Sequence, residues 1–368
     1  MLTVLTVNAG SSSLKLRLIG TADELVADEE LPANRGQAVP EDVVAALERL
    51  GSADAVGHRI VHGGTRFSGP VRLDPGVVEA LRDLTPLAPL HQPAALAALD
   101  AVQQALPDVP AVACLDTAFH ANLRPTSATY ALPREWRERD PLRRYGFHGL
   151  SHAYASRRAA QLLDRRADTL RIVTCHLGAG ASLAAVAGGR SVDTTMGFTP
   201  TEGLVMATRS GSVDPGLILW LLEHGGRAIA EVSDGLEYRS GLLGLTGTSD
   251  MREVLARARG GDPSAVLGRD LYLHRLRGLI AAMAAAMDGL DALVFTGGVG
   301  ERSSEIRRGA AAGLGFLGVA IQADADADAV PDTDVSARGA PVRTLVVRAR
   351  EDLEMAHEVR ATLDPGGH

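Results

Sequence analysis

Lysine is almost missing from this chain, and cysteine and aromatic residues are scarce. The chain holds 37 basic residues, and Lys15 is the only lysine among them. The two cysteines, Cys114 and Cys175, lie in apolar runs that are typical of buried strands. Such positions favour reduced core thiols over a disulfide and indicate a reducing compartment.

Long apolar segments and basic clusters are also lacking. No apolar run reaches the ~20 residues of a membrane span. The amino-terminal MLTVLTVNAG shows neither a charged leader nor a small-residue cleavage site. A formal net charge of −8 disfavours nucleic acid and acidic membrane surfaces. We therefore expect a cytoplasmic protein with no membrane and no nucleic-acid partner.

The residues that are present describe a globular protein. The chain has 368 residues, of which 46% are hydrophobic and 22% charged. This length exceeds one ordinary core and predicts two domains. Buried strands are predicted over 54–60 and 109–117, and helices over 92–106 and 151–167. Alternation of strands and helices indicates an α/β fold.

Two segments share one plan. The first is TVLTVNAGSSSLKLRLI and the second is RIVTCHLGAGASLAAVAGGRSVDTT, about 165 residues later. Each has a buried strand, a turn rich in glycine or serine, and a second strand. The repetition predicts a duplicated architecture with a nucleotide in the cleft between its halves. The run 324–334 is acidic, of low complexity and contains a proline, so it is interpreted as a solvated surface loop. A calcium site is the disfavoured alternative, because the glycine and terminal glutamate of an EF-hand loop are missing.

Ten ordered blocks carry a resemblance to a known family. They read NAGSSSLK, GHRIVHGG, LAPLHQPA, LDTAFH, YGFHGLSH, CHLGAGAS, GFTPTEGLVMATRSG, SGLLGLTGTSDMRE, VFTGGVGER and ARED. In order and spacing they resemble the acetate kinase family over essentially the full chain. The resemblance implies a duplicated ribonuclease-H-like fold of the actin, Hsp70 and sugar kinase type, with two domains and an interdomain cleft.

The resemblance also implies how the domains divide and what they do. Residues 1–117, with about 352–368, would form an acyl-kinase domain completed by the C-terminal helix. Residues of about 118–351 would form the nucleotide-binding and dimerisation domain. The implied reaction is direct in-line transfer of the ATP γ-phosphoryl to acetate, giving acetyl phosphate and ADP, in a homodimer.

Four residues match the family's catalytic positions: Arg59, Arg209, His148 and Asp116. Arginines suit phosphoryl transfer because they offset charge on the equatorial oxygens. Asp116 follows a buried strand, where a carboxylate is costly unless it is paired. A lone histidine is more often a core residue, and it is the match to the family that singles out His148.

The metal and acceptor positions follow from the same resemblance. Asn8 and Glu351 match the ligands of Mg²⁺ (or Mn²⁺), a cation that accepts few protein oxygens and keeps several waters. An ordinary helix-start glutamate is the alternative for Glu351, which lies in an atypical Ala-Arg-Glu-Asp run. The implied acceptor site comprises Arg59, Val61, Leu90, His91, Phe147 and Pro200.

The implied nucleotide positions are more numerous. They are Ser11, Ser13, Lys15, His176, Gly178, Ala179, Gly180, Asp250, Met251, Arg252, Gly298, Val299, Gly300, Glu301 and Arg302. Ser11, Ser13 and Lys15 alternate, which in a strand places them on one face. The family pattern is broken at Ala179, Ala207, Ser212 and Arg302, and these departures lie near the predicted nucleotide.

Three readings of the function stay open beside acetate kinase. The first is a related acyl kinase acting on propionate or butyrate, since one added methylene changes the free energy that separates two substrates by only ~1 to 3 kcal/mol. The second is a catalytically weakened binding or regulatory paralogue. The third is a sugar kinase, whose aspartate base would have no need of two arginines.

Overall fold

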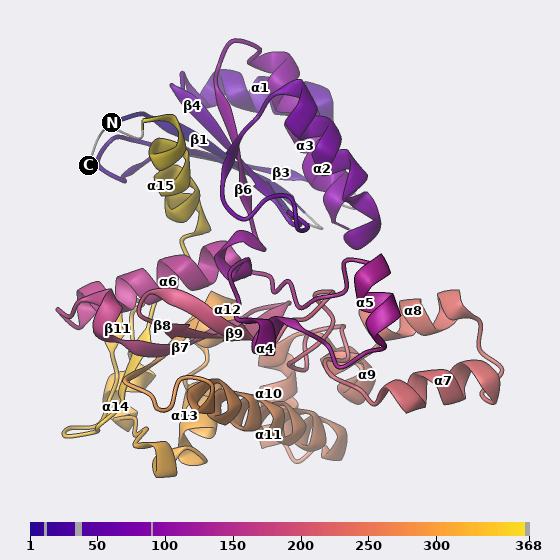
Figure 1. Cartoon of the computed structure of the whole chain (residues 1–368). Helices are drawn as coiled ribbons and strands as arrows, with labels where there is room; N and C mark the ends of the chain where they lie inside the picture. The colour runs from indigo at the N-terminus through magenta and orange to yellow at the C-terminus, as the bar shows by residue number, and fades with distance from the viewer. Residues whose placement is uncertain (11–12, 34–38, 90, 365–368) are drawn as a thin grey trace. The chain divides into compact units, whose positions relative to one another are not determined.

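The computed structural model describes residues 1–10, 13–33, 39–89 and 91–364. The chain divides into two compact units (Figure 1). The first consists of Met1–Asn122, Phe147–Tyr154 and Arg350–His368, and the second of Leu123–Gly146 and Ala155–Ala349. The first unit therefore takes its last helix from the end of the chain.

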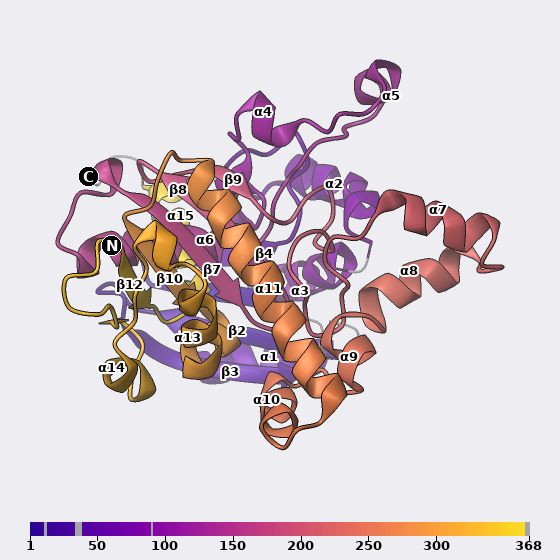
Figure 2. The ribbon, with the colours of Figure 1, turned by 90° about the horizontal axis from the view of Figure 1, so that it is seen from below.

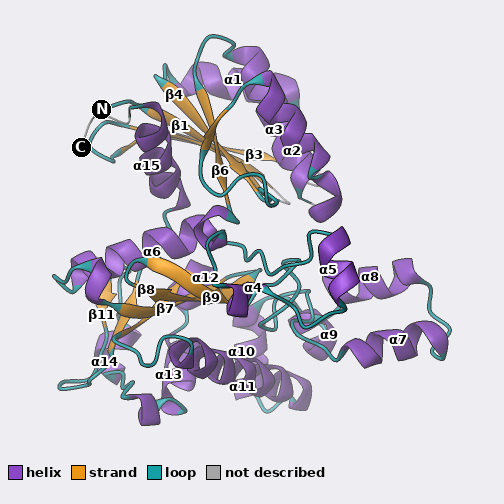
Figure 3. Cartoon of the chain, in the orientation of Figure 1, coloured by secondary structure: helices purple, strands orange, loops and turns teal. Residues whose placement is uncertain are grey.

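Each unit contains a six-stranded sheet in the described part of the chain (Figure 3). The strands of the first are β1 (Val4–Ala9), β2 (Ser13–Ile19), β3 (Leu25–Pro32), β4 (Ala55–Ile60), β5 (Val71–Arg72) and β6 (Ala111–Leu115). Those of the second are β7 (Arg171–Leu177), β8 (Ala181–Ala187), β9 (Arg190–Thr194), β10 (Ala292–Thr296), β11 (Thr333–Asp334) and β12 (Arg343–Val346).

The described part of the chain also forms α-helices. They are α1 (Pro40–Leu50), α2 (Pro75–Asp83), α3 (Gln92–Ala105), α4 (Pro125–Ala128), α5 (Arg134–Arg139), α6 (Gly149–Leu162), α7 (Pro215–Glu223), α8 (Ile229–Tyr238), α9 (Gly241–Thr246), α10 (Met251–Arg259), α11 (Pro263–Ala285), α12 (Gly297–Arg302), α13 (Ser304–Ala312), α14 (Ala323–Ala327) and α15 (Glu351–Leu363). Among the described residues, no helix is long and apolar enough to cross a membrane.

The two sheets have the same topology. Their orders are β3-β2-β1-β4-β6-β5 and β9-β8-β7-β10-β12-β11. In each, the first three strands form an antiparallel meander, the next two run parallel to the central strand, and the last is antiparallel. The duplication predicted from the two repeated segments is therefore present in the backbone.

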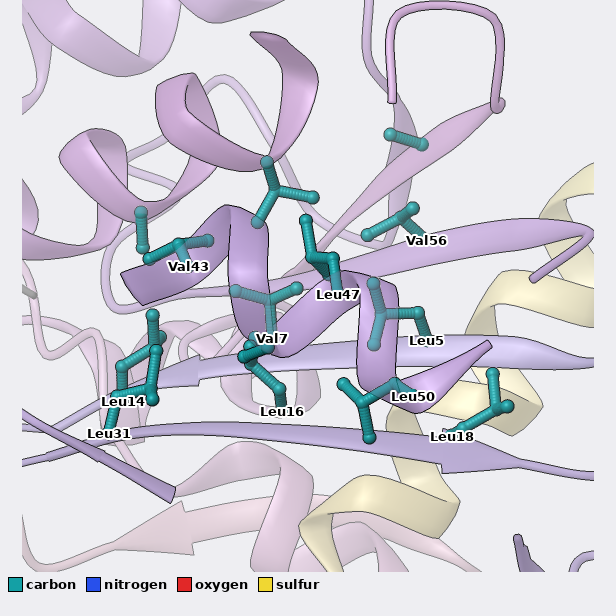
Figure 4. Packing of buried hydrophobic residues seen from close by; sticks show 14 residues of the cluster. Leu5, Val7, Leu14, Leu16, Leu18, Leu31, Val43, Leu47, Leu50 and Val56 are labelled. Atoms are coloured by element: carbon teal, nitrogen blue, oxygen red, sulfur yellow. The ribbon is translucent and has the colours of Figure 1, made fainter. Parts of the chain in front are cut away.

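Helices pack against both faces of the first sheet. Side chains of β1, β2 and β3 form one core with α1 and α3, including Leu5, Leu16 and Leu47 (Figure 4). On the opposite face, Val4 and Cys114 pack against Met355 of α15. Because strand side chains alternate between faces, these contacts fix which residues of each strand point toward α15.

The second sheet is covered on one face by α11, the longest helix of the described residues. α11 packs against β7 and β8 and runs across the sheet (Figure 2). It begins at a proline after the N-cap Asp262, whose carboxylate accepts from the backbone of Ser264. Such a start satisfies backbone N–H groups that the helix itself cannot.

The acidic run corrects one expectation. Residues 323–327 form α14, and Asp326 is fully buried in an ion pair with Arg307, 2.6 Å from its Nε. The interpretation of this run as a solvated loop is therefore wrong at Asp326. A buried carboxylate needs such a partner, and a sequence rich in aspartate does not show which one has it.

Candidate active site

Strand alternation gathers three polar residues of the first unit on one face. In β1, Val4 faces α15, so Asn8 lies on that face too. In β4, Gly57 lies against Val359 of α15, and Arg59 shares its parity. Asp116 shares the parity of Cys114 and directly follows β6. All three lie where parallel strands end, the edge at which α/β sheets bind ligands.

A hydrogen-bond network links these residues to the start of α15. Arg59 Nη2 donates to Asp116 Oδ2 at 2.6 Å, and its Nε lies 3.1 Å from both carboxylate oxygens. Arg59 Nη1 donates to Asn8 Oδ1 at 3.0 Å, and Asn8 Nδ2 donates to Glu351 Oε2 at 3.1 Å. Glu351 Oε2 is 3.6 Å from Arg59 Nη1. The guanidinium is thereby held at Nε and Nη2 by Asp116 and at Nη1 by Asn8.

Burial and pairing oppose one another in this network. Burial raises the pKa of Asp116, and the adjacent Arg59 charge counteracts that rise. Burial works against the charge of Arg59, but Asp116 and Glu351 outweigh it and raise its pKa. Arg59 therefore stays charged, and a fixed cation is the group that a transferring phosphoryl requires.

His148 lies next to the Arg59 network because its neighbour Gly149 is hydrogen-bonded to the backbone of Asp116. The Gly149 N–H donates to the Asp116 carbonyl at 2.8 Å. A Cβ at Gly149 would lie 2.2 Å from that oxygen, so only glycine permits the approach. His148 itself has φ of +57°, a strained backbone for a residue with a side chain. Strain of this kind is typical of functional positions.

The oxygen donors of this network suit a hard cation. Asn8 supplies an amide oxygen, and Asp116 and Glu351 supply carboxylates. Within the described ranges no three His, Cys, Asp or Glu side chains gather as a metal cluster. Mg²⁺ needs only one or two carboxylates because it keeps its waters, so the residues present fit it.

Beside Arg59, three described residues of the predicted acceptor site belong to the first unit. Val61 follows β4, and His91 is the N-cap residue of α3. Phe147 is buried, and its ring meets the His62 ring edge-on at 5.5 Å. Leu90 lies outside the described residues. Pro200 belongs to the second unit, where its carbonyl accepts from Arg209 Nη1 at 3.0 Å.

Arg209 differs from Arg59 in its surroundings. Apart from Pro200, its guanidinium contacts the Met206 sulfur at 3.8 Å. Burial lowers the pKa of Arg209, and the charge of Glu237 counteracts this. Within the described part of the chain no carboxylate is hydrogen-bonded to it.

β2 carries two of the predicted phosphate contacts. Lys15 pairs with Asn8 across the antiparallel ladder, so the two side chains share one face. Its ammonium is 3.9 Å from Glu30, to which Ser13 Oγ also donates, at 2.6 Å. Ser11 lies outside the described residues.

The second unit contains a cavity of about 690 Å³. Eight of the predicted nucleotide residues line it: Gly178, Ala179, Asp250, Met251, Arg252, Gly298, Val299 and Arg302. Gly178 and Ala179 form the tight turn after β7, closed by a 2.9 Å bond from Gly178 N to Gly180 O. Arg252 donates to the Asp250 carboxylate and, with the backbone of α10, lowers the pKa of Asp250 to about 2.

Four other predicted nucleotide residues of this unit are not in the cavity lining. His176 is half-buried in β7, and Gly180 closes the turn. Gly300 faces β7, and the Glu301 carboxylate accepts from the backbone of Gly297 and Ala349. Glu301 thus supports the backbone of α12.

Sequence reasoning missed part of the cavity wall. The additional lining residues are Leu242, Ser249, Leu255, Arg259, Tyr272, Ser303, Ser304, Glu305 and Arg308, beside Ala207, which the sequence had placed near the nucleotide. Leu255 and Arg259 follow Met251 at spacings of four along α10, so helical periodicity could have found them. Tyr272 and Leu242 come from other helices and carry no such signal.

Known proteins resemble this chain over most of its length. The family model described as the acetokinase family matches residues 38–357. An acetate kinase of Leifsonia xyli subsp. xyli is 44% identical, with each chain covered completely. One from Synechococcus is 43% identical over 96% of this chain and 97% of that protein.

Solved structures agree with this match. The Porphyromonas gingivalis acetate kinase has a TM-score of 0.89 and 34% identity, covering 98% of this chain and all of that one. A Francisella tularensis propionate kinase has a TM-score of 0.90 and 33% identity, covering 99% and 100%. The predicted two-domain α/β fold is confirmed, and the chain belongs to the acetokinase family.

Proposed function

We propose that this chain catalyses reversible transfer of the γ-phosphoryl of ATP to acetate, giving acetyl phosphate and ADP. Its family membership makes it a kinase with a carboxyl group as acceptor. The observation that carries the proposal is the buried Arg59 network, because it fixes a cation and two carboxylates where three parallel strands end. Hydrolases of phosphate esters need a base to activate water, but a carboxylate acceptor is already a nucleophile.

Atoms and charge balance in a single displacement. An acetate oxygen attacks the γ-phosphorus, the bond from that phosphorus to the β–γ bridging oxygen breaks, and ADP leaves. Arg59 and Arg209 would offset the charge on the equatorial oxygens. His148 would donate a hydrogen bond to the same group.

We assign the nucleotide to the second unit and the acceptor to the first. The Gly178–Ala179 turn suits phosphate because glycine lets the backbone approach a ligand closely. Val61, His91 and Phe147 would surround the methyl group of acetate, with Leu90 and Pro200 as further predicted neighbours. The phosphates would be contacted directly by Ser13, Lys15 and His176. Glu301 would act on them indirectly, because it holds the backbone of α12.

Asn8 and Glu351 would hold Mg²⁺, with Asp116 beside them. The metal would neutralise charge on the nucleotide phosphates. Arg59 already donates to Asn8 and Asp116, so these residues are oriented in advance by the chain's own hydrogen bonds.

Propionate is the second candidate acceptor. The observation in its favour is the likeness to a solved propionate kinase at 33% identity and a TM-score of 0.90. One added methylene changes the free energy by about 1 to 3 kcal/mol, so both acids should be turned over.

We further propose a cytoplasmic homodimer that uses the α7 and α8 surface. α7 has no buried residue, and Leu219 and Trp220 are more than half exposed. Ile229 of α8 is 77% exposed. A second copy could cover this surface by twofold symmetry, because one apolar patch can then meet itself. Trp220→Glu should convert a dimer into a monomer on light scattering without loss of helix content.

Trapping acetyl phosphate with hydroxylamine tests the activity. Purified chain with ATP, Mg²⁺ and acetate should form acetyl hydroxamate, and omission of either substrate should abolish it. ATP binding without turnover on acetate, propionate or butyrate would instead support a binding or regulatory role.

A further inference from the structure

Four arginines line the cavity of the second unit, and one of them differs from the rest. Arg252 Nη2 lies 2.6 Å from Asp250 and Arg259 Nη1 lies 2.7 Å from Glu305. Arg308 donates to Ser304 Oγ at 3.1 Å and is 3.6 Å from Asp326. Arg302 makes no side-chain hydrogen bond or ion pair with any described residue. It is the cation of this wall that remains available to a ligand.

The helix that carries Arg302 is held at both ends. At its start, Glu301 Oε1 accepts from Gly297 N at 3.1 Å and from Ala349 N at 2.8 Å. At its end, the buried Arg307 donates from Nη1 to the Gly300 and Glu301 carbonyls, both at 2.8 Å. Arg307 is fixed in turn by Asp326. The backbone of Arg302 is therefore placed in advance, which lowers the entropy cost of a contact it makes.

Arg302 lies at the far end of α12 from the glycine turn. Gly297 has φ of +78°, and a Cβ there would be 2.9 Å from the Leu177 carbonyl, so α12 starts against the end of β7. Arg302 follows five residues later, roughly 7.5 Å along the helix axis. A nucleotide with its phosphates at the Gly178–Ala179 turn would then have its base toward Arg302.

We propose that Arg302 reads the purine base and makes the chain prefer a phosphodonor with a carbonyl at C6, such as GTP or ITP, over ATP. A guanidinium carries only donors. Guanine and hypoxanthine present two acceptors, O6 and N7, which arginine contacts in a bidentate manner. Adenine presents a donor at N6, which opposes the guanidinium. The inference rests on the proposed nucleotide site and names its preferred base.

Affinities for GDP, IDP and ADP, measured by titration calorimetry with Mg²⁺, test this without turnover. The wild type should bind GDP and IDP more tightly than ADP. Arg302→Asn should shift the GDP to ADP ratio toward ADP by about fivefold to 150-fold, because asparagine suits adenine N6 and N7. Arg338→Asn, at an exposed arginine outside the cavity lining, should leave the ratio unchanged.

The outcomes separate the inference from the proposed function. ADP binding to the wild type that is as tight as or tighter than GDP binding, or an unchanged ratio in Arg302→Asn, would overturn the base preference. Equal weakening of all three nucleotides would also overturn it, since Arg302 would then contact the sugar or phosphates. A GDP preference that is lost in the variant, in a protein making no acetyl phosphate with GTP or ATP, would leave the inference standing and reject the proposed reaction.

Discussion

The two sheets have one topology, but the residues that follow their parallel strands differ in kind. In the first unit Asn8 and Arg59 lie near the ends of β1 and β4, Asp116 directly follows β6, and the three side chains are joined by hydrogen bonds. In the second, β7 leads into Gly178 and β10 leads into Gly297. Gly178 belongs to a turn without a bulky side chain, and the backbone of Gly297 packs closely against the end of β7. The same duplicated scaffold thus presents charged side chains in one copy and main-chain groups in the other.

Arg59→Ala should have the largest effect, because it damages both activity and stability. Loss of one such arginine should slow transfer by about 10³ to 10⁵. It also leaves the Asp116 carboxylate buried without its partner, which should cost about 3 to 5 kcal/mol in the free energy of unfolding. Hydroxamate assays and urea unfolding measure the two effects.

The matched control is Arg72→Ala, at an exposed arginine of β5. It should change neither quantity. Full stability in Arg59→Ala would show that the network does not hold the first unit together.

Arg209→Ala should slow transfer by a similar factor and leave stability almost unchanged. Its guanidinium donates to a carbonyl and no carboxylate is hydrogen-bonded to it within the described ranges, so no buried charge is stranded. The same assays apply, with Arg190→Ala in β9 as control. An unaffected rate would refute the catalytic role of Arg209, and a large loss of stability would break the contrast with Arg59.

Acid should destabilise the first unit through three buried histidines. Burial lowers the pKa of His58 to about 3 and those of His62 and His120 to about 4. Each is neutral when folded but takes a proton near pH 6.5 when unfolded. Their contribution is therefore complete above pH 6.5 and is lost as the pH falls toward 4, by about 1.4 kcal/mol per pH unit for each histidine.

Unfolding free energies between pH 7 and 4 measure this loss. His58→Leu should flatten the curve, because both ring nitrogens of His58 are buried and find no hydrogen-bond partner among the residues that the structure describes. His274→Gln, at an exposed histidine, should not. A curve with the wild-type slope in His58→Leu would contradict the assignment.

Ala179→Asn should have the smallest effect. It adds an amide donor to the exposed turn of the second unit, and one hydrogen bond to phosphate should raise nucleotide affinity roughly two- to tenfold. ADP affinity is the measurement. No change would mean that backbone groups alone bind the phosphates there.

Much of the fold could be predicted from the sequence. The apolar runs at β1, β4, β6 and β10 are buried strands, and the repeated strand-turn-strand segments mark the duplication. Local periodicity was less informative for α7, none of whose apolar residues is buried in the single chain. It gave no sign of α14 either, because the burial of Asp326 depends on Arg307 from another helix.

The candidate site divides in the same way. Strand parity alone predicts that Asn8, Arg59 and Asp116 can share a face, once the strands are known to be neighbours. The support given by Glu301 to Gly297 and Ala349 could not be predicted, since it joins segments almost fifty residues apart through backbone groups. Sequence motifs identify residues that contact a ligand more readily than they identify the residues that position those contacts.

The acyl-acceptor profile, measured as kcat/KM for acetate, propionate and butyrate with saturating nucleotide, tests the central claim most directly. Acetate should be the best acceptor, and propionate should follow within about 10- to 200-fold, as one methylene allows. Turnover of propionate or butyrate with no acetyl phosphate formed from acetate would contradict the claim.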